Sequence, residues 1–203
     1  MSITTYSELK TAVANWLNRD DLTSVIPDFI SLAEARIARD LRHWKQEKRV
    51  TTDANERYEN LPNDFIEIRQ VQHAAGGAIS SVSSVEMEKL RAASDAGGKP
   101  KYMRLTAEQI EFYPTPDTNY SISMLYYGRI PALSDVDTSN WLLRDAPDVL
   151  LYGALLQSAP YLVDDARVQV WASLYASTIN AINLEGERSK TGGSGRRMRI
   201  RSY

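Results

Sequence analysis

The sequence has no cysteine and only two histidines among 203 residues. The absence of cysteine excludes disulfides, thiolate metal sites and cysteine nucleophiles. His43 and His73 lie in no metal-ligand spacing such as H-E-x-x-H, so we expect His43 to be a surface or capping residue and His73 to end a strand. No apolar run approaches the roughly 18 to 20 residues that span a bilayer, and the first ten residues lack a signal-peptide pattern. We therefore expect a soluble protein made and kept in a cytoplasm, with no membrane partner.

Motifs for catalysis and nucleotide binding are also lacking. The glycine pairs at 76–77 and 97–98 have neither the lysine nor the strand-loop-helix context of a phosphate loop, and the Gly-Ser-Gly run at 192–195 is a polar linker. Three groups of neighbouring aspartates lie at helix ends or in linkers, where aspartate caps backbone N–H groups. They are Asp20 with Asp21, Asp135 with Asp137, and Asp164 with Asp165. We expect no catalytic residue, cofactor or metal, although a glycosidase pair drawn from distant acids stays open.

Charges of both signs are abundant but unevenly distributed. The chain has 24 Lys and Arg against 26 Asp and Glu, for a net charge of -2. Residues 186–203 hold six basic residues and one acid, a net of +5, so residues 1–185 hold 18 basic and 25 acidic residues, a net of -7. The sequence thus predicts an acidic body with a basic C-terminal segment.

Helical periodicity predicts two helices near each end of the chain. Thr5 and Glu8 have the spacing of a capping box, ahead of an apolar face made by Leu9, Val13, Trp16 and Leu17. A second helix is expected at about 27–43, with its apolar stripe formed by Phe29, Ile30, Ala33, Ile37, Leu41 and Trp44. A third is expected at about 145–159, capped by Asp145 with Pro147 in its first turn. A fourth, at about 164–184, places Ala166, Val170, Trp171, Leu174, Ile179 and Ile182 at helical spacing.

The middle of the chain changes to the period of two that is typical of strands. Strands are expected at 47–52, 57–60, 66–74, 101–105, 109–113 and 120–128, and a short helix capped by Ser84 at about 84–93. The segment 114–119 contains two prolines and reads as a turn, which predicts a hairpin between 109–113 and 120–128. These elements predict a small antiparallel sheet.

The predicted fold class is α+β. A bundle of about four main helices carries a small antiparallel β domain inserted between its N-terminal and C-terminal helix pairs, followed by an extended C-terminal arm. We expect four parts: N-terminal helices at 1–46, the β domain at 47–130, C-terminal helices at 131–185, and a flexible basic arm at 186–203.

The expected arm has a flexible Gly-Ser hinge at 191–195, followed by a segment, 197–201, in which arginine alternates with apolar residues. Six cations on such an arm could neutralise phosphates and bind nucleic acid. Alternatively, the alternating segment could dock as a strand on an acidic partner, with arginines pairing to carboxylates. A solvated tail is the third reading, against which Met198, Ile200 and Tyr203 argue.

Seven fragments, in this order along residues 5–185, carry a resemblance to a known family. They are TYSEL at 5–9, FISLAEARIARDL at 29–41, LPNDFIEIR at 61–69, FYPTPD at 112–117, YY at 126–127, IPALS at 130–134 and NWLL at 140–143. Together they resemble the phage head-to-tail adaptor proteins, the neck subunits of tailed bacteriophages.

This resemblance implies a structural, non-enzymatic virion protein located in the neck and assembled in a host bacterial cytoplasm. Its copies, usually twelve in this family, would form a ring below the portal protein, provide a platform for the tail or nozzle protein, and let DNA pass without specific binding. The arm would reach the portal, which makes the following residues candidates for docking: Arg188, Lys190, Arg196, Arg197, Met198, Arg199, Ile200, Arg201 and Tyr203. The alternatives are a nucleic-acid-binding protein that uses the basic arm and a tail-associated cell-wall hydrolase.

Overall fold

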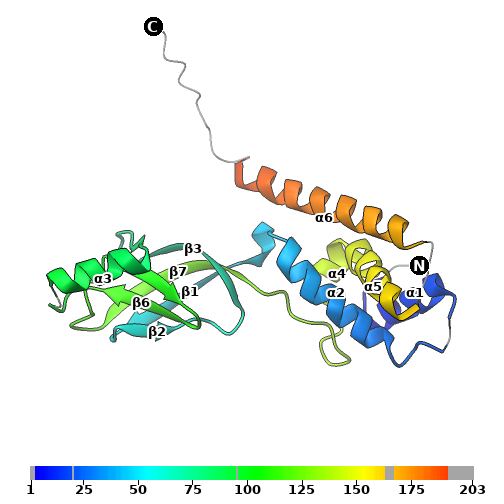
Figure 1. Ribbon diagram of the computed structural model, residues 1–203, viewed down its shortest axis with the longest axis horizontal. Helices are drawn as coiled ribbons and strands as arrows, with labels where there is room; N and C mark the ends of the chain where they lie inside the picture. The colour runs from blue at the N-terminus through cyan, green and yellow to red at the C-terminus, as the bar shows by residue number, and fades with distance from the viewer. Residues whose placement is uncertain (1–2, 20, 95, 163–166, 192–203) are drawn as a thin grey trace, which may run out of the picture. The chain divides into compact units, whose positions relative to one another are not determined.

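A computed structural model describes residues 3–19, 21–94, 96–162 and 167–191 (Figure 1). The fold is α+β, as predicted, with helices from the two ends of the chain packed together and two small sheets formed by its middle. The chain divides into two compact units. We call Met1–Lys45 with Ile130–Tyr203 the helical unit, and Gln46–Arg129 the β unit.

The helical unit is built around one buried helix. Its elements are α1 (Tyr6–Leu17), α2 (Ile26–Asp40), the short α4 (Trp141–Asp145), α5 (Pro147–Leu162) and α6 (Val168–Thr191). Helix α5 has a single charged residue, Asp148, and packs against α1, α2, α4 and α6. Because α5 has no broad polar face, it is buried as the centre of the bundle. Close packing of α5 on α2 depends on Gly153, where an added Cβ would lie 3.1 Å from the Cβ of Ala33.

Local signals define the start of α1 as predicted. The backbone N–H of Glu8 donates to the hydroxyl of Thr5 (3.3 Å), and the Glu8 carboxylate accepts from the backbone N–H of Thr5 (3.0 Å). This reciprocal capping box satisfies backbone donors that the first turn leaves without a partner in the helix. Leu9, Val13 and Leu17 then pack in the core, whereas Trp16, predicted on the same face, is 46% exposed.

The β unit contains two sheets that share one apolar cluster. Strands β1 (Glu47–Ala54), β7 (Tyr120–Gly128) and β3 (Phe65–His73) form an antiparallel sheet in the order β1-β7-β3. The second sheet has the order β2-β6-β5-β4, with β2 (Tyr58–Asn60), β6 (Gln109–Tyr113), β5 (Tyr102–Thr106) and the short β4 (Ser80–Ser81), which pairs parallel to β5. Helix α3 (Ser84–Ala93) contacts β5 and β6. Met87, on α3, is fully buried.

The predicted hairpin between 109–113 and 120–128 is wrong, although both strands have the predicted bounds. Strand β6 pairs with β5 and β2, and β7 pairs with β1 and β3 in the other sheet. The tight connection is instead the one between β5 and β6, where Ala107 adopts a positive φ of 43°. The longer, proline-containing 114–119 segment carries the chain from one sheet to the other.

Several predicted helix ends also differ. Ser83, not Ser84, caps α3, because its hydroxyl accepts from the backbone N–H of Glu86 (3.2 Å). Asp145 ends α4 instead of capping α5, and α2 ends at Asp40, short of the predicted 43. Helix α6 continues through Thr191, so residues 186–191, predicted to belong to the arm, are helical. Residues 192–203, and 163–166 at the predicted start of that helix, lie outside the described residues.

The predicted surface position of His43 is wrong, but the alternative of a capping contact is present, because its Nδ1 accepts from the backbone N–H of Lys45 (3.3 Å) in the turn that follows α2. His43 is 2% exposed and stacks on Trp141, with ring centroids 5.4 Å apart, while Trp44, predicted on the apolar stripe, is 43% exposed in the 3-10 turn η1 (Trp44–Gln46). The helical stripe breaks here because α2 ends at Asp40, so the later residues no longer follow its period.

Candidate partner-binding surfaces

The predicted docking residues are only partly within the described chain. Arg188 lies on α6 with an exposed side chain, and the backbone of Lys190 belongs to the same helix. The other predicted docking residues, Arg196, Arg197, Met198, Arg199, Ile200, Arg201 and Tyr203, lie outside the described residues. The assignment of these residues to a docking site therefore stays a prediction, and α6 is the element that leads into it.

Helix α6 has one buried face and one exposed face. Trp171, Tyr175 and Ile179 are buried against the helical unit. The exposed face carries a line of small and apolar residues spaced alternately by four and three positions: Val170, Leu174, Ser177, Ala181 and Leu184. Such spacing keeps side chains in one row along a helix. We call this row the α6 stripe.

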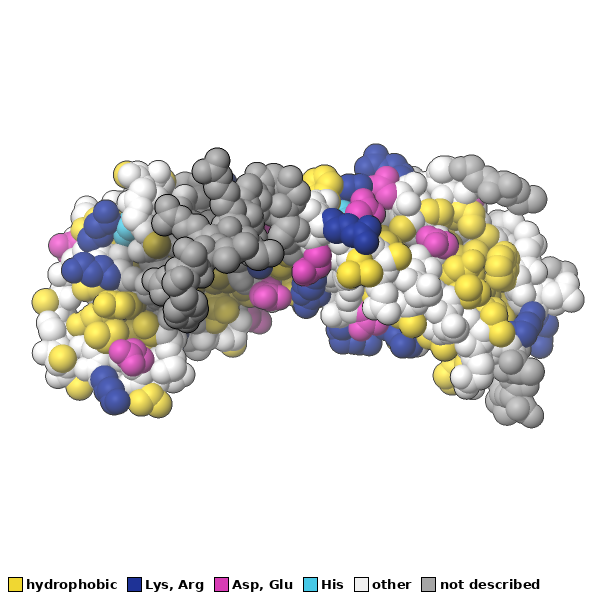
Figure 2. All heavy atoms as spheres, turned by 90° about the horizontal axis from the view of Figure 1, so that it is seen from above, with side chains coloured by type: hydrophobic (Ala, Val, Ile, Leu, Met, Phe, Trp, Pro, Cys, Tyr) yellow, Lys and Arg dark blue, Asp and Glu magenta, His cyan; other side chains and the backbone are white. Residues whose placement is uncertain are grey.

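The α6 stripe lies in a stretch without charge. Residues 168–184 contain no Asp, Glu, Lys or Arg, although 25% of the whole chain is charged. Val170 and Leu184 are each 57% exposed in this unit. Figure 2 shows hydrophobic side chains gathered on the helical unit, at the right of the view. Because exposed helix faces normally carry charged residues, an uncharged face along several turns is typical of a surface that becomes covered.

Hydrogen bonds fix α6 to the end of α2. The hydroxyl of Tyr175 donates to the Asp40 carboxylate (2.9 Å), and the Asn183 side chain exchanges hydrogen bonds with the backbone carbonyl of Asp40 and the backbone N–H of Arg42, each at 2.9 Å. Burial and the neighbouring Asp40 raise the pKa of Tyr175, so this hydroxyl remains a donor at neutral pH. A Cβ at Gly186 would lie 3.1 Å from the ring of His43, so a larger residue here would have to push the ring aside by a few tenths of an ångström. The direction of α6 is therefore set by specific contacts along its length.

A groove runs along the outer side of α1. Its volume is about 550 Å³, and it is lined by Ile3, Ser7, Glu8, Thr11, Ala12, Asn15 and Trp16. Three of the lining residues, Ser7, Thr11 and Asn15, are small or polar and follow one another at four-residue spacing, and Trp16 packs edge-on against Tyr152 with ring centroids 5.8 Å apart. We call this feature the α1 groove. Sequence periodicity placed Trp16 in the core, but only Leu9, Val13 and Leu17 of the predicted face are buried there.

The β unit contains a buried carboxylate that is held by three arginines. Glu111 is fully buried, and it accepts from Arg57 (2.6 Å), Arg91 (2.9 Å) and Arg104. Burial on its own raises the pKa of Glu111, but the hydrogen bonds and charges of Arg57 and Arg104 outweigh it, so the pKa lies below its usual range. A carboxylate held ionised in this way ties α3, β5 and β6 together and is poorly suited to exchange protons near neutral pH.

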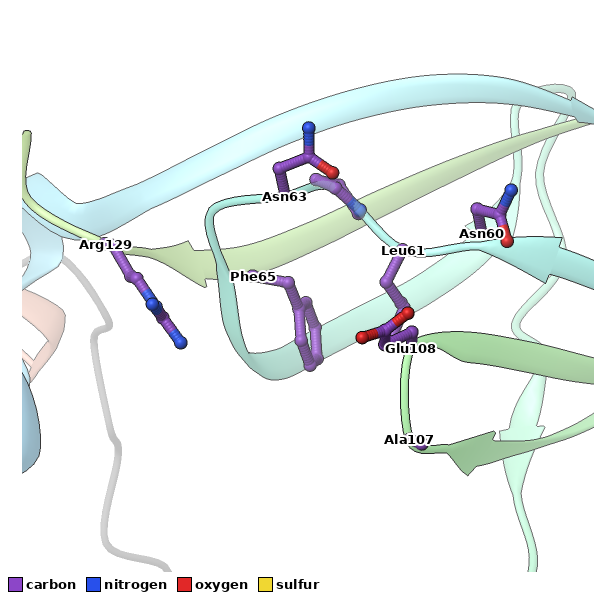
Figure 3. Close-up of a pocket in the computed structure, with 8 residues that line it drawn as sticks. Asn60, Leu61, Asn63, Phe65, Ala107, Glu108 and Arg129 are labelled. Carbon is purple, nitrogen blue, oxygen red and sulfur yellow. The ribbon is translucent and has the colours of Figure 1, made fainter.

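An open pocket of about 530 Å³ lies at the end of the β unit. It is formed by the β2–β3 corner, the β5–β6 turn and the residue after β7, and its lining residues are Asn60, Leu61, Pro62, Asn63, Phe65, Ala107, Glu108 and Arg129. Figure 3 shows the Phe65 ring between Arg129 and Leu61, with Glu108 beside Leu61. The lining offers amides, one acid and one base but no nucleophile paired with a base.

Of the histidines and aspartates considered above as catalytic residues or metal ligands, several make structural contacts. His73 hydrogen-bonds the backbone carbonyl of Pro100 through Nε2 (2.7 Å), and Asp135 pairs with Lys10 (2.8 Å). Asp20, Asp164 and Asp165 lie outside the described residues. Within the described ranges, no three of the His, Asp and Glu side chains come together as a metal site. Nor does any helix among them combine the length and apolar character that a membrane crossing requires.

Comparison with protein-family models places the chain in a known family. A family model described as SU10 adaptor protein matches residues 4–200, which include both the helical unit and the β unit. The curated proteins contain no match.

Proposed function

The chain belongs to the SU10 adaptor protein family, a family of phage structural proteins, and from this premise we propose that it is a head-to-tail adaptor of the virion neck. Several copies would form a ring below the portal, twelve being the number that the family resemblance implies. The ring would offer a platform to the tail or nozzle protein and a passage for DNA. The observation that carries the proposal is the family match over nearly the whole chain.

The charge distribution supports a ring through which DNA passes. Residues 1–185 have a net charge of -7, whereas residues 192–203 carry four arginines and no acid. An acidic wall does not retain phosphates, so it would leave DNA free to move. The four arginines beyond α6 have no acid among them in the sequence, and they would pair with an acidic partner.

We assign portal docking to the residues beyond Thr191. The contacts of Tyr175 and Asn183 with the end of α2 fix the direction of α6, the helix that precedes this segment in the chain. Arg197, Arg199 and Arg201 alternate with Met198 and Ile200, a pattern that suits a strand added to the edge of a partner sheet. Arginine forks then pair with carboxylates on the portal.

A truncation tests this assignment. A chain that ends at Thr191 retains all of α6 and should fold normally, yet it should lose binding to the portal protein in a pull-down or by calorimetry. A matched full-length variant with Arg197, Arg199 and Arg201 all replaced by Lys keeps the charge but loses the bidentate forks, and should bind with intermediate affinity. Full portal binding by the truncated chain would show that the docking segment lies elsewhere.

Nucleic-acid binding is the second candidate, because the same four arginines could contact phosphates. A titration of duplex DNA at several salt concentrations separates the two roles, since binding through several cations must weaken steeply as salt rises. The adaptor role predicts weak binding to DNA and tight binding to the portal. The reverse order of affinities would favour the nucleic-acid role.

We also propose that the chain has no catalytic activity. The buried acid of the β unit is held ionised by three arginines, and the two histidines make structural contacts. A peptidoglycan clearing assay tests the cell-wall hydrolase alternative, and clearing that survives substitution of Glu111 would have to come from another acid.

A further inference from the structure

We propose that the α6 stripe of one copy docks in the α1 groove of the next copy, so that each subunit presents one ridge and one groove to its two neighbours. This inference rests on the proposed ring and names the surfaces that would form it. The partner is a second copy of this chain. Three properties of the described residues support this choice: charge, shape and placement.

The charge pattern favours a partner that is also uncharged. Residues 168–184 carry no charge, and of the seven residues that line the α1 groove only Glu8 is charged. That carboxylate is already used by the capping box with Thr5. Nucleic acid is a poor occupant of the stripe because phosphate binding needs cations there. The stripe brings no charge that would have to be removed from water, and the one charge of the groove already has hydrogen-bond partners at the start of α1.

The proposed contact places a ridge against a groove. The α6 stripe is a ridge in which Val170, Leu174 and Leu184 project, and the α1 groove has small residues at i, i+4 and i+8 between the larger Ile3 and Trp16. Packing a ridge of one helix into a groove of another is the usual mode of helix contact. The 12 residues of α1 span about 18 Å and residues 168–184 about 25 Å, so the groove can accept several turns of the ridge.

The placement of the two surfaces favours a head-to-tail contact. Helices α1 and α6 both pack against α5, so the groove and the stripe lie on different elements of one compact unit. A contact between two different surfaces leaves one of each unused on every added copy, and repetition then produces a ring or a filament. A pairing of α6 with α6 across a two-fold axis would instead stop at a dimer.

The size of the contact indicates why the free subunit would remain monomeric. A strip about 25 Å long and about 10 Å wide covers on the order of 250 Å² per partner, well below the roughly 800 Å² typical of a stable pair. Such a contact is weak by itself. It becomes stable when the subunits are held side by side on a portal and the ring closes.

The absence of cysteine allows a direct test by disulfide or bismaleimide cross-linking. Thr11→Cys lies in the middle of the α1 groove and Ser177→Cys in the middle of the α6 stripe, and both native side chains are exposed. Phage particles carrying the doubly substituted chain are cross-linked, and the products are separated on a denaturing gel. The matched control combines Ser177→Cys with Val136→Cys, because Val136 is 89% exposed on the same unit but lies outside both surfaces.

The proposal predicts a ladder of dimers, trimers and larger products for the Thr11 and Ser177 pair, and at least tenfold less cross-linking for the control. Cross-linking by Ser177→Cys alone into dimers only would overturn it in favour of α6–α6 pairing. Transfer of the Ser177 cross-link to the portal protein would also overturn it. Electron microscopy of the same particles distinguishes failure of this interface from failure of the proposed function. A ring without the ladder contradicts this interface alone, whereas particles without a ring contradict the proposed function.

Discussion

The two units of this chain are stabilised in different ways. The helical unit has an apolar core built around α5, whereas the β unit places the carboxylate of Glu111 among three arginines beside its apolar cluster. Helices α1 and α6 of the helical unit also bear the two surfaces that we assign to neighbouring copies, an α1 groove whose described lining has one charged residue and an uncharged α6 stripe. The difference indicates that the ion pairs of the β unit stabilise that unit internally, while the helical unit has exposed faces suited to association.

Optical signals can follow the two units separately. All four tryptophans, Trp16, Trp44, Trp141 and Trp171, belong to the helical unit, and the β unit contains none. Tryptophan fluorescence therefore reports on the helical unit. Six of the eleven tyrosines lie in the β unit, so the near-ultraviolet circular dichroism of tyrosine reports on both units, and a tyrosine transition that tryptophan fluorescence does not share belongs to the β unit.

Removing the buried charge should have the largest effect on stability. Glu111→Gln keeps the size of the side chain but leaves Arg57, Arg91 and Arg104 without their shared carboxylate, so it should lower the free energy of unfolding of the β unit by about 3–5 kcal/mol. Urea unfolding followed by tyrosine dichroism measures this loss. Tryptophan fluorescence should show little change in the helical unit.

The matched control is Glu88→Gln, whose exposed carboxylate lies 3.8 Å from Arg104 and should contribute less than about 1 kcal/mol. Equal losses from the two variants would contradict the bracing role of Glu111.

Acid should affect the two units in opposite directions through two glutamates. The pKa of Glu111 is below its usual range in the folded β unit, so its contribution is present above the unfolded pKa and is lost as pH falls through the folded value. Burial raises the pKa of Glu34, which accepts one hydrogen bond from the backbone N–H of Leu133 (2.8 Å), so its contribution is present at low pH and is lost as pH rises through the folded value.

Urea unfolding at several pH values below neutrality, followed by the two signals, tests this contrast. As pH falls through the ordinary glutamate range, about 4.3, and below it towards the folded pKa of Glu111, the β unit should lose stability relative to the helical unit. Glu34→Gln is the matched variant for the helical unit, and it should remove the part of that unit's pH dependence that Glu34 supplies. An unchanged pH profile in this variant would show that Glu34 is ionised equally in the folded and unfolded chains.

A charge on the α6 stripe should have the smallest effect on stability and a large effect on assembly. Val170→Glu changes an exposed residue, so the free energy of unfolding should change by no more than about 0.5 kcal/mol. Ring formation should nevertheless be lost, because the charge would be buried without a partner in the α1 groove. Val136→Glu makes the same substitution at a more exposed valine outside both surfaces, and it should leave both stability and assembly unchanged. Normal rings from the Val170 variant would exclude the stripe as an interface.

Local structure was predicted well from the sequence, and long-range pairing was not. The capping box at Thr5 and Glu8 and the bounds of β6 and β7 depend on neighbouring residues, and the structure confirms them. The partner of β7 could not be predicted because alternation identifies a strand but not the strand beside it. The proline-containing segment after β6 therefore suggested a hairpin that the fold does not form.

The candidate surfaces were missed for a related reason. Helical spacing assigned Val170 and Leu174 to the same apolar set as Trp171, but the buried face of α6 is centred on Trp171, Tyr175 and Ile179. Period alone cannot show which of two uncharged faces meets the core. The lack of charge over residues 168–184 was visible in the sequence, and it is the signal from which we infer that a second face is an interface.

Imaging the neck of an assembled phage particle by electron microscopy tests directly whether this chain forms a ring there. We expect a ring of copies of this chain between the portal and the tail, with the helical units side by side and the C-terminal segments in contact with the portal. A neck in which this chain is absent, or in which it does not form a ring, would contradict the proposed adaptor role.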